Sequence, residues 1–192
     1  MQPNLKSIYS LYKDEINPLI SILEMFNFQG TVVVYGELNN ANSYLHKYEL
    51  EGSEQDLLKA EKNMRHVSIL CYKYVSQCYI EQIAEFYHKQ RNFDLSMVND
   101  GRFLKKLRKL EIEADKCFKS AIANEQIENI DQKFLYLQFK KVFEMYDDIV
   151  KYIKASSKSV MFAKRYSKKL YYIAIGSLCL GVLSIALMFL IN

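Results

Sequence analysis

The chain has 192 residues, of which 50% are hydrophobic, 25% charged and 14% aromatic. This is enough apolar material for one core, and it excludes a disordered tail or a multidomain enzyme. Six Gly and two Pro leave little material for the tight turns of a sheet protein, so the composition predicts an all-α fold. The net charge of +4 is too small to indicate nucleic-acid binding unless the charges are clustered.

Between the glycines, apolar residues recur at helical spacing and predict about five helices. The expected ranges are 4–27, with Pro18 early in it or kinking it, 32–50, 53–91, 102–124 and a last helix that begins near 128. The stretch TVVVYG at 31–36 is strand-like but isolated, so we expect it in a helix or turn. We expect a cytoplasmic bundle over 1–127 and a long amphipathic helix over 128–169.

The last expected helix carries an uncharged seam at the alternating four- and three-residue spacing of a coiled coil. Its members are Leu135, Phe139, Val142, Tyr146, Ile149, Ile153, Ser156, Val160, Ala163, Ser167 and Leu170. Two interpretations remain open, packing against its own domain and assembly with other copies. The same register continues into small residues, Ala174, Ser177, Gly181 and Ser184, which favour close helix packing in lipid and are the candidate oligomerisation or pore residues.

Residues 170–191 form an uncharged, apolar stretch of 22 residues, about 33 Å long as a helix. A buried core helix of this length would normally carry a polar face, so the stretch predicts a single C-terminal transmembrane helix. The basic residues before it predict, by the positive-inside rule, that residues 1–169 are cytoplasmic, and they are candidates for contact with lipid headgroups. These residues are Lys164, Arg165, Lys168 and Lys169.

Residues that could carry chemistry are few. The histidines lie on different expected helices without metal-ligand spacing, so we expect no metal site and no cofactor. Phosphate-binding loops, dinucleotide-binding turns and nucleophile elbows are absent. The four cysteines form no CxxC pair and are expected to be free thiols. They are Cys71, Cys78, Cys117 and Cys179.

Four stretches together resemble the HEPN-domain proteins, small helical bundles common in bacterial defence and toxin–antitoxin systems. They are IYSLYKDEINPLISILEMF at 8–26, GELNNANSYLHKY at 36–48, LLKAEKNMRHVSILCYKYV at 57–75 and RFLKKL at 102–107. HEPN ribonucleases carry an Arg followed four to six residues later by a His. In this chain Asn39 and Tyr44 stand at the equivalent places, so the resemblance implies a degenerate HEPN domain without an assigned catalytic residue.

Together with the expected membrane span, this bundle resembles the membrane accessory proteins of type VI-B CRISPR loci, which form oligomeric pores downstream of an RNA-guided ribonuclease. The resemblance implies an oligomeric effector of antiviral defence that perturbs the bacterial inner membrane. Its implied partners are membrane lipid, further copies of the chain and, functionally, an RNA-guided ribonuclease. Whether RNA is bound stays open.

Two alternatives come from other functional classes. One is an adaptor that recruits a cytoplasmic partner to the membrane. The other is a membrane-bound ribonuclease with an unusual site around Arg65, His66 and His46. Adjacent residues on a helix point about 100° apart, so Arg65 and His66 do not easily serve one scissile bond, and we expect the chain not to be an enzyme.

Overall fold

The computed structural model describes the backbone of residues 4–191 and the side chains of residues 4–180. Within that part every regular element is a helix and no strand occurs. The elements are α1 (Leu5–Leu11), the π-helix η1 (Tyr12–Ile16), α2 (Asn17–Met25), α3 (Thr31–Glu51), α4 (Glu54–Gln90), the 3₁₀ segment η2 (Leu95–Gly101), α5 (Arg102–Glu125) and α6 (Gln132–Ile191). The all-α class is confirmed, and the strand-like stretch 31–36 lies in α3.

The first expected helix contains a π-turn instead of a kink. Pro18 has no N–H to donate to the carbonyl of Asp14, and its ring crowds that carbonyl. The backbone widens just before it, and the N–H of Asn17 donates to the carbonyl of Tyr12, five residues back. α1, η1 and α2 therefore follow one another without a loop.

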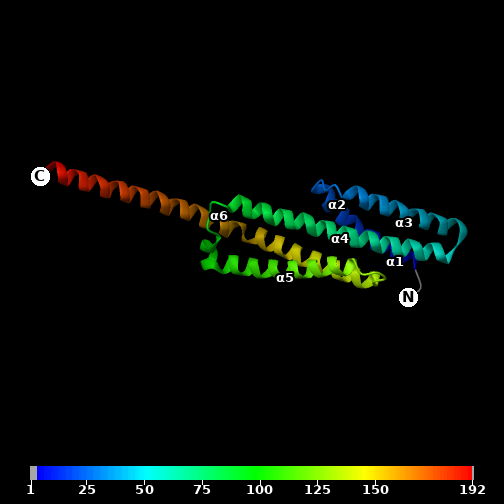
Figure 1. Cartoon of the computed structure of the whole chain (residues 1–192). Coiled ribbons are helices and arrows are strands. Elements are labelled where there is room, and N and C mark those ends of the chain that lie inside the picture. Colours follow the sequence, from blue (N-terminus) through cyan, green and yellow to red (C-terminus); the bar gives the residue numbers. More distant parts are fainter. Residues whose placement is uncertain (1–3, 192) are drawn as a thin grey trace.

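The helices pack side by side around α4 and α6 (Figure 1). α2 and α3 lie on one side of α4, α6 lies on the other, and α5 packs on α6. α6 has 60 residues, about 90 Å of helix. Its first half belongs to the bundle, and the rest extends beyond every other helix, at the end opposite to the N-terminus (Figure 1).

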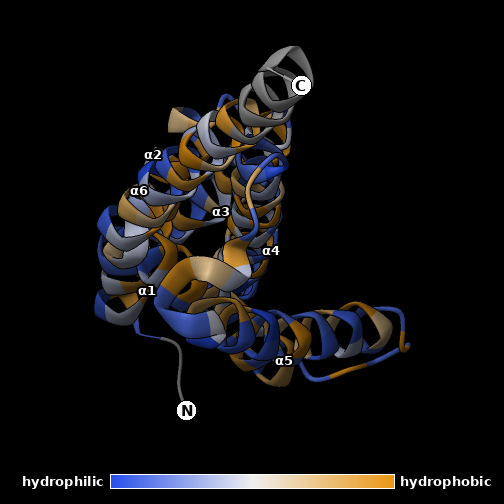
Figure 2. Cartoon of the chain, turned by 90° about the vertical axis from the view of Figure 1, so that its left-hand side faces the viewer, coloured by the Kyte–Doolittle hydropathy of each residue, from blue (hydrophilic) through white to orange (hydrophobic). Residues whose placement is uncertain are grey.

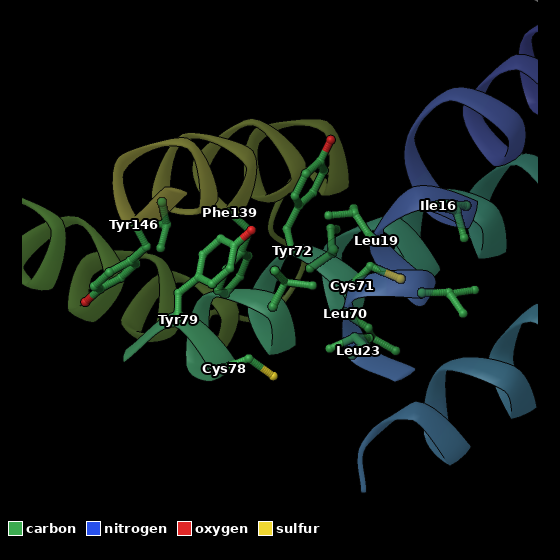
Figure 3. Close-up of a cluster of buried hydrophobic side chains, with 14 of the residues drawn as sticks. Ile16, Leu19, Leu23, Leu70, Cys71, Tyr72, Cys78, Tyr79, Phe139 and Tyr146 are labelled. Atoms are coloured by element: carbon green, nitrogen blue, oxygen red, sulfur yellow. The ribbon is translucent and has the colours of Figure 1, made fainter. Parts of the chain in front are cut away.

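The core forms on two faces of α4 (Figure 3). Leu70 and Cys71 lie toward Leu19 and Leu23 of α2, while Tyr79 lies toward α6 (Figure 3). Burial raises the pKa of the Cys71 thiol to about 12. All four cysteines are free, as expected.

The first half of the seam packs inside its own bundle. Its first five members, Leu135, Phe139, Val142, Tyr146 and Ile149, are at most 3% exposed. They lie on α6, which packs between α4 and α5. For this half, the interpretation as packing within the domain is confirmed.

A partly buried carboxylate joins three helices. Glu15 of η1 accepts hydrogen bonds from the hydroxyl of Tyr72 on α4 and the hydroxyl of Tyr136 on α6, both at 2.6 Å. Lys140 of α6 adds an ion pair at 3.0 Å. Burial by itself would raise the pKa of Glu15, but the donors Tyr136, Tyr72 and Lys140 outweigh it and lower the pKa. The ionised carboxylate is thus the form that stabilises the fold.

The expected transmembrane helix is wrong for the part of the chain that the structure describes. Among these residues, no helix combines the length and the apolar character that crossing a membrane requires. Of the candidate pore residues, Gly181 and Ser184 lie outside the residues with described side chains.

Replacing Glu15 by Gln should lower the free energy of unfolding by about 2–3 kcal/mol at pH 7, because it removes the charge from three hydrogen bonds. The folded-state pKa lies below the unfolded value of 4.5, so the wild-type advantage is complete above that pH and is lost as the pH falls below it. Urea titrations at pH 7 and pH 3 measure this difference. Asp14→Asn, at an exposed neighbouring carboxylate, is the control, and an equal loss in both variants would contradict the role of Glu15.

Candidate functional site

The surface that stands out is the part of α6 that leaves the bundle, which Figure 2 views from the side toward which the helix projects. Val160 is the last buried residue among those described, and Lys164 Nζ makes a final contact with Gln90 Oε1 of α4 at 3.1 Å. Beyond them lies what we call the apolar segment, residues 170–178. Tyr172, Ile173 and Leu178 in this segment are 70%, 65% and 70% exposed.

The apolar segment has no polar face. Tyr171, Tyr172 and Ile173 are consecutive and all exposed, and consecutive residues on an α-helix point about 100° apart. Apolar groups therefore surround the helix. A helix with this distribution is normally buried on all sides, unlike the half-buried helices of the bundle.

A cluster of positive charge on one side of α6 precedes the apolar segment. We call Lys164, Arg165, Lys168 and Lys169 the basic collar. None of the four forms an ion pair with a described residue. The sequence contains no Asp or Glu after Asp148, so acidic neighbours on the same helix are absent. The collar is thus an uncompensated cationic surface next to an apolar one.

The small residues of the seam are exposed where side chains are described. Ala174 and Ser177 lie in the apolar segment, and the hydroxyl of Ser177 donates to the carbonyl of Ala174 at 2.9 Å. A Cβ added to Gly176 would meet no atom within 4 Å. The hydroxyl is satisfied within its own helix, so this face is open for close approach of another helix.

The positions assigned to a degenerate HEPN site do not form a site. Asn39 is exposed on α3. Tyr44, five residues later, points about 140° away around the helix, and its ring lies under the ammonium groups of Lys47 and Lys59, 5.6 and 5.5 Å from its centre. Tyr44 therefore has a packing role on α3.

The three weak ribonuclease candidates are also separated. Arg65 forms an ion pair with Glu61 one turn before it. His66 lines a hollow of about 490 Å³ between α4 and the start of α6, together with Lys62 and Gln132. His46 lies exposed on α3 and does not line this hollow. The hollow offers an ammonium, an imidazole, the carboxylate of Glu125, which pairs with Lys73 at 2.7 Å, and a buried Gln132 Oε1 without a described partner, so it can bind polar groups.

The sequence did not predict a pair of carboxylates on α5, Glu111 and Asp115. Glu111 accepts from the hydroxyl of Tyr87 at 2.9 Å, and Asp115 accepts from the hydroxyl of Tyr146 at 2.6 Å. The second oxygen of Glu111 is buried without a described partner. Burial raises the pKa of Glu111, Asp115 adds to the rise, and the Tyr87 hydrogen bond opposes it. The four-residue spacing of Glu111 and Asp115 on an amphipathic helix was the available signal.

Comparison with known proteins gives no relative: no family model, no curated protein and no solved structure matches the chain. Together with the lack of a membrane-crossing helix in the described residues, this overturns the resemblance to HEPN-domain and CRISPR membrane accessory proteins. Within the described residues, no group of three or more His, Cys, Asp or Glu side chains could hold a metal ion. The function is therefore inferred from the geometry of the chain itself.

Replacing Glu111 by Gln should raise the free energy of unfolding by about 1 kcal/mol at pH 7, because the amide still accepts from Tyr87 without a buried charge. The folded-state pKa lies above the unfolded value of 4.5, so the gain should appear as the pH rises through that range and vanish below it. Thermal unfolding at pH 4 and pH 7 tests this. Glu113→Gln, on the exposed side of the same helix, should change little, and a destabilised Glu111→Gln would refute the argument.

Proposed function

We propose that this protein acts at an anionic lipid surface and that the basic collar and the apolar segment of α6 make the contact. The observation that carries the proposal is the exposed apolar segment directly after an uncompensated cluster of four positive charges. The proposed activity is binding of these residues to the lipid surface.

The shape of the apolar segment favours lipid over a single protein partner. One partner helix covers one stripe of a helix, whereas exposed Tyr171, Tyr172 and Ile173 lie on different sides. Acyl chains can surround the segment on all of them. Tyrosines next to such a segment also suit the interface between headgroups and chains, where aromatic residues with a polar tip are enriched.

The collar supplies the selectivity for negative charge. A Lys or Arg near an anionic membrane surface contributes about 1 kcal/mol to binding. Four of them, with no ion-pair partner among the described residues, can all face headgroups. Lys151, earlier on α6, is instead paired with Asp147 at 2.6 Å, so it does not belong to the basic collar.

At that surface, the role best supported is that of an oligomeric effector that perturbs the bilayer. The small exposed residues Ala174 and Ser177 support assembly, because they let helix backbones approach closely in lipid. An adaptor that carries a partner to the surface would need the collar and the apolar segment but no such assembly.

Neutralising the collar tests the lipid contact. The variant Lys164→Gln, Arg165→Gln, Lys168→Gln, Lys169→Gln should bind vesicles containing phosphatidylglycerol at least tenfold more weakly, measured by co-sedimentation at 0.1 M salt. The matched control removes the same charge from exposed α5 positions, Lys105, Lys109, Lys116 and Lys119, and should bind nearly as wild type. Equal losses in both variants, or equal binding to neutral vesicles, would sink the proposal.

Release of an entrapped dye from the same vesicles separates the two roles. An effector should release dye, and Ala174→Leu together with Ser177→Leu should reduce release while binding persists, because bulky residues hold helices apart. Binding without release by the wild type would instead favour the adaptor.

A further inference from the structure

We infer that the groove between the last turns of α4 and the middle of α6 binds one acyl chain of a long-chain fatty acid, with its carboxylate at the lysines on the groove's rim. The inference rests on the proposed function, because it names a lipid that the same end of the molecule would take from the surface it contacts.

The groove consists of two adjoining hollows of about 180 and 390 Å³, which share Phe86, Ile153 and Lys154. It follows α6 from Val150 to Lys164, about 21 Å of helix. Its floor is mostly apolar and includes Ile83, Phe86, Val150, Ile153 and Val160. At the end away from the collar, Gln82, Glu85 and Lys89 also line it; Glu85 is paired with Lys89 at 2.7 Å, and the buried Oε1 of Gln82 has no described partner.

The groove is open because α2 and α3 stop short of it. The turn between these helices lies against the middle of α4, where Phe26 meets Tyr79 and Phe28 meets Tyr74, with ring centres 6.3 and 5.3 Å apart. From about Ile83 onward, α4 therefore extends past the corner that covers its earlier turns. One side of the α4–α6 contact is left without a covering helix.

The rim of the groove carries positive charge in its middle, at Lys154, and at its end near the collar, at Lys164. Lys154 forms no ion pair with a described residue, and Lys164 bonds only to neutral groups, Gln90 Oε1 at 3.1 Å and the carbonyl of Lys89 at 3.4 Å. Lys164 belongs both to the groove and to the basic collar. The groove is therefore continuous with the proposed lipid contact, and a carboxylate at its rim would meet ammonium groups.

The size of the groove favours an acyl chain over an α-helix as its occupant. Spread along about 21 Å of α6, hollows of 180 and 390 Å³ average roughly 30 Å² in cross-section or less, whereas an α-helix about 10 Å across takes roughly 80 Å². A single polymethylene chain is narrow and flexible, and its burial against an apolar floor contributes about 0.8 kcal/mol per CH₂. Ligand pockets of this total size bind small molecules.

The test uses dansyl-undecanoic acid as the probe, at concentrations below those at which it forms micelles, and follows its fluorescence. Laurate should displace the probe, and dodecanol, which lacks the charge, should displace it at least fivefold less well. Ser157 lines the groove from an exposed position, so Ser157→Trp should fill the groove and weaken binding at least tenfold. Ala155→Trp, exposed and outside the groove, should stay within twofold of wild type.

A more conservative substitution keeps the test valid if Ser157→Trp does not fold. Lys154→Gln should weaken probe binding about threefold or more, whereas Lys158→Gln, exposed on the same helix but outside the lining, should not. Unchanged affinity in Ser157→Trp and Lys154→Gln, with normal helical circular dichroism, would overturn the groove assignment. Vesicle co-sedimentation of the same variants stays at the wild-type level if only the groove fails, whereas failure of the proposed function appears as lost selectivity for anionic vesicles.

Discussion

Buried tyrosines that donate to carboxylates on neighbouring helices fix how the bundle fits together. Tyr72 and Tyr136 donate to Glu15, Tyr87 to Glu111, and Tyr146 to Asp115. Each pair joins two helices. If either helix rotates or slides, it leaves a partly buried hydroxyl and its carboxylate unpaired, which costs about 1–3 kcal/mol. Apolar packing alone tolerates such shifts better, so these pairs set the register of α4, α5 and α6.

The position of α6 decides everything outside the bundle. Its first half is held on one side by Glu15 and on the other by Asp115, through Tyr136 and Tyr146. The direction in which the helix leaves the bundle follows from these contacts. The part of α6 that carries the basic collar and the apolar segment therefore lies at one end of the molecule, beyond the corner between α2 and α3 (Figure 1).

The helices could be predicted from the sequence because each depends on spacing within one segment. The expected ranges 32–50, 53–91 and 102–124 match α3, α4 and α5 within three residues at either end. The tyrosine–carboxylate pairs could not be predicted, because Glu15 is 57 residues from Tyr72 and 121 from Tyr136, and no local pattern marks such partners. The π-turn before Pro18 was also not predicted, because a proline indicates that a helix is disturbed but not which irregular turn forms there. At the candidate site, the sequence indicated the basic collar and the apolar character of the segment that follows it. The length of the uncharged stretch also predicted a membrane span, which the described residues do not support.

The continuity of α6 links the bundle to the proposed lipid contact mechanically. Between Gln132 and Gly176 the helix contains no Gly and no Pro, so nothing in its sequence provides a hinge. A rigid helix anchored at one end by Tyr136 and Tyr146 holds the bundle at a fixed angle to whatever surface binds the other end. In the proposed function, the mouth of the groove at Lys164 then lies at headgroup depth. A chain taken from the lipid surface would then follow the groove to the floor around Phe86, where one side of its methylene groups is buried against apolar side chains.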